Sequence, residues 1–96
     1  MSMRSIRCVY VIYDIQDNST RYDLANILIF YGLHRVQYSV FSGLISPEDK
    51  RNMLREIESL GLGVEDKVYV FDLCRRCVEG MVVIGKVDRG RGHLIF

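Results

Sequence analysis

The chain has 96 residues, of which 49% are hydrophobic and 26% charged, with 13 Lys and Arg against 12 Asp and Glu. This composition is typical of one packed globular domain, and it excludes a disordered chain, a repeat protein or two independently folding domains. No apolar run approaches the roughly 18 to 20 residues of a membrane span, and Asp14 interrupts the first apolar stretch too early for a secretory signal. The expected location is therefore the cytoplasm, with no membrane partner.

Residues 8–13 alternate on two apolar faces and are rich in β-branched and aromatic side chains, which predicts a central strand that Asp14 ends. A helix is expected next, with N-cap candidates over residues 18–20 and its end at Gly32. Its apolar stripe has helical spacing and consists of Leu24, Ile27, Leu28 and Tyr31.

Residues 35–45 read as extended chain with a tight reversal whose position the pattern does not fix. Ser46 and Pro47 then give a strong helix start, with Ser as the cap and Pro at the first helical position. Gly61 and Gly63 are expected to end this helix. Its buried stripe is predicted to be Met53, Ile57 and Leu60.

Residues 67–73 predict a further strand, residues 81–84 a short one, and residues 93–96 a candidate terminal strand. This order of elements indicates an α+β sandwich in which two helices cover one face of an antiparallel sheet. If residues 35–45 hold two antiparallel strands, the plan is ferredoxin-like, βαββαβ, with a short extra C-terminal strand.

Asp14 is the first candidate for chemistry, because it closes the most apolar strand at its carboxyl end. A carboxylate at that place can bind a hard cation such as Mg²⁺, which uses one or two protein carboxylates and keeps several waters. On the residues alone, a turn or capping role for Asp14 is the more common alternative.

Cys74 and Cys77 have the spacing of a redox pair or of half a zinc site. Zinc would need two further ligands, and Cys8, His34 and His93 show no ligand spacing. Buried, reduced thiols at a strand end are therefore expected, in keeping with three cysteines that lack a disulfide framework.

Basic residues are concentrated after residue 74, although the formal net charge is only +1. Interleaved with glycine, they suit a segment that contacts phosphates, and a solvated terminus is an equally good alternative. Arg21 and Arg35 could extend the positive surface. The basic residues of the segment are Arg75, Arg76, Lys86, Arg89 and Arg91.

Several motifs in register resemble one known family. They are Tyr13-Asp14-Ile15 at the end of the first strand, Tyr31-Gly32-Leu33 after the Arg21-bearing helix, Arg35-Val-Gln-Tyr-Ser-Val-Phe41, Ser46-Pro47, Val68-Tyr-Val-Phe71 and Val83-Ile-Gly85. Together they resemble the small CRISPR-associated adaptation protein, the nuclease-fold partner of the CRISPR integrase. The match covers about residues 7–86, and the whole chain, residues 1–96, is expected to be a single domain. Residues 87–96 form a tail, which is a candidate for a strand that docks on the dimer partner.

The resemblance implies a ferredoxin-like fold, a two-fold homodimer, and a Mg²⁺ site in the dimer cleft where the two Asp14 carboxylates face each other. It further implies two roles. One is metal-dependent cleavage of phosphodiester bonds in DNA or single-stranded RNA, and the other is bridging of integrase dimers during spacer acquisition.

For the site, the resemblance implies that Asp14 is the catalytic and metal-binding residue and that Arg21, Arg35 and Ser39 contact the nucleic acid. Arg75 and Arg76 are expected to join that contact as part of the basic segment. The rival hypothesis is a non-catalytic DNA-binding scaffold in which Asp14 is structural. The sequence leaves RNA or DNA open as the substrate.

Overall fold

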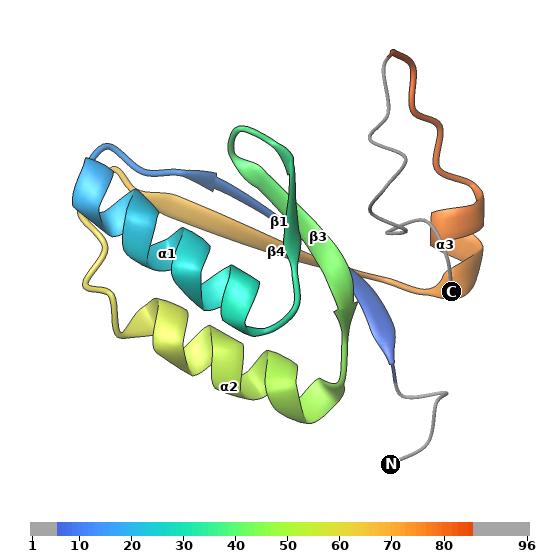
Figure 1. The fold of residues 1–96 in the computed structure, drawn as a ribbon, viewed down its shortest axis with the longest axis horizontal. Coiled ribbons are helices and arrows are strands. Elements are labelled where there is room, and N and C mark those ends of the chain that lie inside the picture. Colours follow the sequence, from blue (N-terminus) through green and yellow to red (C-terminus); the bar gives the residue numbers. More distant parts are fainter. Residues whose placement is uncertain (1–5, 86–96) are drawn as a thin grey trace.

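The computed structural model describes residues 6–85. The elements follow one another in the order β1 (Arg7–Asp14), α1 (Asn18–Phe30), β2 (His34–Gln37), β3 (Val40–Ile45), α2 (Pro47–Glu58), β4 (Lys67–Leu73) and α3 (Arg75–Glu79). The four strands form an antiparallel sheet with the spatial order β2-β3-β1-β4. This is the ferredoxin-like βαββαβ plan, so the predicted fold class is confirmed (Figure 1).

The main core lies between the sheet and the pair α1 and α2, which run along one side of it (Figure 1). Alternation along β1 directs Val9, Val11 and Tyr13 toward the helices, and all three are buried. The predicted stripes of the two helices supply the other side of this core. Its helical members include Leu24, Ala25, Leu28, Met53 and Ile57.

Local sequence signals explain where the helices begin and end. Asp17, rather than a residue of 18–20, caps α1, and its carboxylate accepts a 2.8 Å hydrogen bond from the Thr20 backbone N–H. Gly32 follows α1 with φ of +91°, a conformation that favours glycine. Ser46 caps α2 as predicted, accepting from the Asp49 backbone N–H at 3.1 Å.

The reversal between the two middle strands lies at Tyr38 and Ser39. The backbone carbonyl of Ser39 accepts a 3.1 Å hydrogen bond from the Tyr13 backbone N–H, which continues the β1–β3 ladder past its last pair. The predicted extended region therefore contains two antiparallel strands, and its turn lies beside the carboxyl end of β1.

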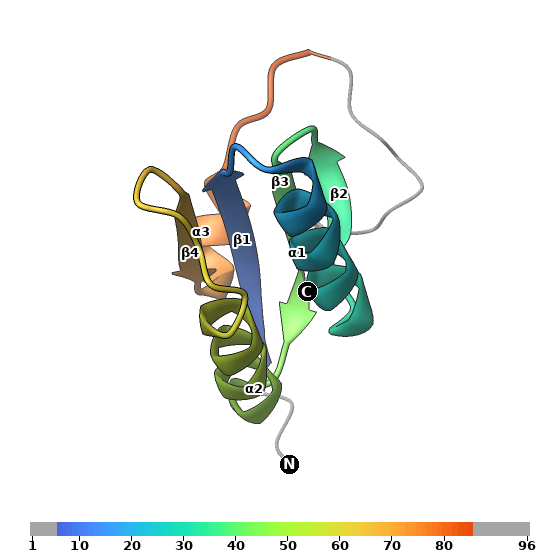
Figure 2. The same cartoon turned by 90° about the vertical axis from the view of Figure 1, so that its left-hand side faces the viewer.

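The segment after β4 differs from the prediction. Residues 75–79 form the short helix α3, and residues 81–84 form no strand. Val78 of α3 is buried, and α3 contacts β1 and β4. Figure 2 shows α3 on the opposite side of the sheet from α1 and α2. The candidate strand over 93–96 lies outside the described residues.

The two thiols near α3 correct another expectation. Cys74 and Cys77 are exposed rather than buried, and the buried residue of α3 is Val78. Cys8 alone among the three cysteines is buried.

Across residues 6–85, no helix is long and apolar enough to cross a membrane.

Candidate functional site

Asp14 lies at the carboxyl end of β1, as predicted, and is exposed. Strand alternation places Asp14 on the sheet face opposite the two long helices, together with Tyr10 and Ile12. Near Cys8 this face is covered by α3, and we call the rest of it the open face. Lys67, the first residue of β4, is the register partner of Asp14. The carboxylate therefore lies at one end of the open face beside a cation.

The open face carries large apolar side chains that stay partly exposed. Ile12 is 39% exposed, Leu44 40%, Tyr69 51% and Phe71 47%. The rings of Tyr69 and Phe71 stack along β4 with centroids 6.4 Å apart. A contiguous surface of this kind, ending at a carboxylate, is typical of an interaction face.

Two groups hold the loop that follows Asp14. The Arg21 guanidinium donates to the Ile15 carbonyl at 2.7 Å and to the Gln16 carbonyl at 3.2 Å. From the other side, the Asp66 carboxylate accepts from the Gln16 backbone N–H at 3.1 Å. Asp66 was not predicted, because its contact joins loops 50 residues apart in the sequence. Arg21 therefore positions the chain that leaves the candidate catalytic residue.

Arg21 and Arg35 line one hollow of about 170 Å³, together with Tyr13, Asn18 and Tyr38. Arg35 donates to the Tyr38 carbonyl, and its guanidinium lies 4.9 Å from the centroid of the Phe41 ring. A guanidinium has five N–H donors, so each arginine can bind an anion while keeping these contacts. The structure thus places the two predicted arginines beside the same hollow.

This hollow and Asp14 lie at the same end of β1 but on different sides of the sheet. Tyr13, which lines the hollow, faces the helices, and Asp14 alternates to the open face. Ser39 occupies the turn between them, with its backbone bonded to β1. A polynucleotide strand that touched Asp14, Ser39 and the two arginines of the hollow would pass around the end of the sheet.

Arg75 and Arg76 lie at the opposite end of the sheet. They follow Leu73, whose register partner is Cys8 near the start of β1. The eight residues of β1 separate the two ends, roughly 25 Å at the rise of an extended strand. Within one chain, these two arginines therefore do not join the Asp14 end.

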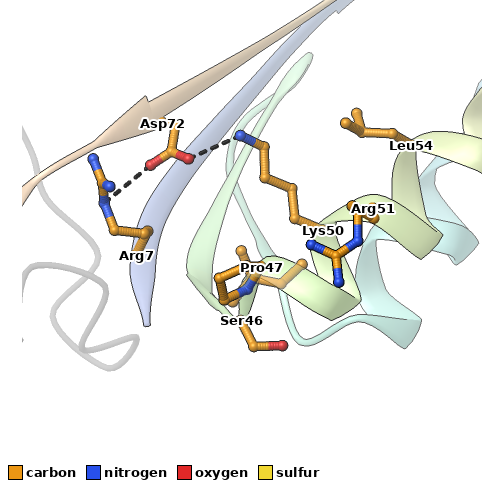
Figure 3. Close-up of a pocket in the computed structure, with 8 residues that line it drawn as sticks. Arg7, Ser46, Pro47, Lys50, Arg51, Leu54 and Asp72 are labelled. Carbon is orange, nitrogen blue, oxygen red and sulfur yellow. Dashed lines mark hydrogen bonds and ion pairs between the residues drawn. The ribbon is translucent and has the colours of Figure 1, made fainter. Parts of the chain in front are cut away.

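A second basic hollow, of about 440 Å³, opens where the start of α2 meets the ends of β1 and β4. The Asp72 carboxylate lies between Arg7 and Lys50 (Figure 3). Its oxygens are 3.2 Å from Arg7 Nε and 2.8 Å from Lys50 Nζ. Arg51 also lines this hollow, which leaves its walls with an excess of positive charge. The sequence alone does not indicate that these basic side chains lie together, because β4 and α2 meet only in the folded chain.

The donor type at Asp14 fits a hard cation, while one copy supplies too few ligands. Among residues 6–85, no group of three or more His, Cys, Asp and Glu side chains could hold a metal ion. Mg²⁺ accepts one or two protein carboxylates and retains waters. A second Asp14 from another copy would satisfy this preference, because a two-fold axis doubles every residue near it.

Comparison with known proteins assigns the chain to a family. A family model described as CRISPR associated protein Cas2 matches residues 7–81. The chain belongs to the Cas2 family. The resemblance inferred from the motifs is therefore confirmed.

Curated relatives in the Cas2 family cover most of the chain. A protein named CRISPR-associated endoribonuclease Cas2 1 from Archaeoglobus fulgidus is 38% identical over 77% of this chain and 79% of its own length. A Cas2 endoribonuclease from Korarchaeum cryptofilum is 38% identical over 88% of this chain and 90% of its own length. A Cas1/Cas2 endonuclease fusion from Thermoproteus tenax is 30% identical over 74% of this chain and 27% of its own length.

The Cas2-family fold also agrees with a solved structure. The crystal structure of a hypothetical protein from Thermus thermophilus superposes with a TM-score of 0.73 at 30% identity. The match covers 86% of this chain and 95% of that protein. The ferredoxin-like arrangement is thus shared along nearly the whole of both chains.

Proposed function

We propose that this Cas2-family protein is a CRISPR adaptation subunit that cleaves phosphodiester bonds in a metal-dependent reaction. Its site forms when two copies pack through their open faces and bring both Asp14 carboxylates together. The observation that carries the proposal is that Asp14 lies on the same sheet face as the exposed apolar residues of β1 and β4. The relatives named endoribonucleases support the reaction class.

A homodimer follows from the properties of the open face. Burying four half-exposed apolar side chains from each copy would supply the driving force for association. An isologous interface whose two-fold axis passes near the Asp14 end of that face would bring the two carboxylates together. The positive charge of Lys67, the register partner of Asp14 in each chain, would offset part of the repulsion between the two carboxylates.

The two Asp14 side chains would hold Mg²⁺, with waters completing the shell. The metal, when bound, supplies positive charge against the phosphodiester oxygens and acidifies the attacking water. Arg21 fixes the loop that follows Asp14 and so keeps the carboxylate in place. Arg35, at the hollow beyond the Ser39 turn, contacts a neighbouring phosphate of the same strand.

The partners of the proposed dimer are nucleic acid and the CRISPR integrase. The integrase as a partner is supported by the Thermoproteus tenax relative, in which Cas1 and Cas2 are fused in one chain. The proposed dimer carries two copies of every contact surface, which suits a subunit that bridges two integrase dimers. DNA and single-stranded RNA both present the phosphates that the arginines would bind.

Asp14→Asn tests the catalytic role, because it keeps the size of the side chain and removes the charge that attracts the cation. We expect a folded dimer with nearly unchanged nucleic-acid binding and a Mg²⁺-dependent cleavage rate lower by a factor of about 100 or more. Cleavage of labelled RNA and DNA is measured with Mg²⁺ and with excess chelator.

Asp17→Asn is the matched control, since it removes a carboxylate three positions away and keeps an N-cap acceptor. Its cleavage rate is expected to stay near that of the unchanged protein. Cleavage that survives in Asp14→Asn, or in chelator, would exclude the Asp14 site.

A scaffold without catalysis is the second candidate, favoured by the register pair between Asp14 and Lys67. Opposite charges across neighbouring strands stabilise a sheet without any further role. In that case Asp14→Asn weakens the fold or the dimer, and DNA binding and integrase association carry the function. The same variant therefore separates the two candidates by whether assembly or cleavage is lost.

A further inference from the structure

Cys74 and Cys77 form a side-chain pair that the proposed nuclease does not use. Their sulfur atoms lie 3.5 Å apart, and both residues are exposed. Cys74 is the N-cap of α3, and Cys77 lies on the first turn of that helix. The sulfurs are thus already close to each other and open to a small molecule.

The surroundings of the pair favour the thiolate of Cys74. The backbone N–H of Cys77 and then the Cys77 thiol lower the pKa of Cys74, and the Arg76 backbone N–H acts in the same direction. The thiolate is the nucleophile in sulfur chemistry, so a lower pKa makes more of the reactive form at neutral pH. Thiolate formation at Cys74 is therefore favoured.

Cys8 provides a contrast within the same protein. Its side chain is fully buried, and burial raises the pKa of the Cys8 thiol. Its sulfur lies 3.9 Å from the Ser42 hydroxyl. Reaction at Cys8 requires local opening of the fold, whereas reaction at Cys74 does not.

We propose that Cys74 and Cys77 are a dithiol site that exchanges with low-molecular-weight disulfides. The Cys74 thiolate attacks one sulfur of the small disulfide, which forms a mixed disulfide and expels one thiolate. Cys77 then loses its proton and attacks the Cys74 sulfur, which closes the Cys74–Cys77 bond and expels the second thiolate. The protein dithiol is oxidised by two electrons, and the small disulfide is reduced to two thiols.

A dithiol reaction suits this site better than a zinc centre. Across residues 6–85, no third Cys, His, Asp or Glu joins the pair to make a metal-ligand group. A structural zinc site requires four ligands. The two intervening residues and the 3.5 Å separation of the sulfur atoms instead favour an intramolecular disulfide.

The test equilibrates the whole native protein with mixtures of reduced and oxidised glutathione, followed by mass spectrometry of the acid-quenched chain. We expect a single disulfide between Cys74 and Cys77, with Cys8 still a thiol. At pH 7 the alkylation rate of Cys74 should exceed that of Cys8 by about 100-fold or more, since Cys8 reacts only through opening.

Two variants separate the roles of the sulfurs. Cys77→Ser should accumulate the mixed disulfide of Cys74 with glutathione, because the resolving thiol is missing. Cys74→Ser should react more slowly with oxidised glutathione than the unchanged protein does. Cys8→Ser should form the Cys74–Cys77 disulfide as the unchanged protein does. A dithiol that stays reduced in excess oxidised glutathione, or a disulfide formed by Cys8, would overturn the proposal.

Discussion

Gly43 lies where β3 passes closest to the turn between α1 and β2. A Cβ atom at this position would be 3.0 Å from the Gly32 carbonyl oxygen and 3.0 Å from the Leu33 Cα. Both neighbours are backbone atoms, which cannot rotate away as a long side chain can. The absence of a side chain at Gly43 is therefore what lets the turn pack against the sheet.

Gly43→Ala should lower the free energy of unfolding by about 1 to 3 kcal/mol, the usual cost of overpacking. Chemical denaturation measures this loss. Gly80→Ala is the matched control, because its added Cβ would lie 3.6 Å from the nearest atom and its φ of −86° suits alanine. We expect the control to change stability by less than about 0.5 kcal/mol. Equal losses in both variants would contradict the close approach at Gly43.

The sequence predicted most elements of residues 6–85 because their signals are local. The alternation of residues 8–13 and the Ser46-Pro47 cap each lie within one element. By contrast, α3 depends on Val78 packing onto β1 and β4, which no local pattern reveals. Residues 81–84 have strand-like side chains, yet they pair with no strand among residues 6–85.

The candidate site divides in the same way. A strand-terminal Asp14 can be recognised from the sequence, because the residue ends an apolar run. The meeting of Arg21 and Arg35 depends on the register between β1, β3 and β2, and so does the side of the sheet on which their hollow lies. Contacts of that kind depend on which residues of neighbouring strands pair. The sequence pattern predicts the strands but not the register between them.

The two ends of the sheet give separate predictions for nucleic-acid binding. Each phosphate contact that is lost should reduce the slope of log affinity against log salt by roughly one unit. The double variant Arg21→Gln and Arg35→Gln should therefore flatten the slope on a 20-base-pair duplex by roughly two units for each copy that contacts the duplex. Glutamine keeps a donor for the Ile15 and Gln16 carbonyls, which limits damage to the loop.

The double variant Arg75→Gln and Arg76→Gln probes the other end of the sheet with the same change of charge. A duplex of that length exceeds the roughly 25 Å between the ends, so both pairs are expected to contribute. Fluorescence anisotropy over a range of salt concentrations measures the slopes. A pair whose removal leaves the slope unchanged does not belong to the interface.

At the scale of the whole molecule, the proposed dimer would link assembly to chemistry through the open face. Apolar side chains on β1, β3 and β4 would drive two copies together, and the carboxylate at the end of β1 would gain its counterpart in the same step. Residues on α1 and α2 play no part in this contact, so their hollows stay available to other partners. A dimer built this way is inactive unless both copies carry Asp14.

Mixed dimers test that dependence quantitatively. Unchanged protein and Asp14→Asn are combined in equal amounts, unfolded and refolded together so that the copies pair at random. If one site needs both Asp14 residues, only dimers of two unchanged copies cleave, and about a quarter of the activity remains. If each copy works alone, about half remains. Cleavage per total protein, measured across several mixing ratios, should follow the square of the unchanged fraction, and a straight line would contradict a site shared between two copies.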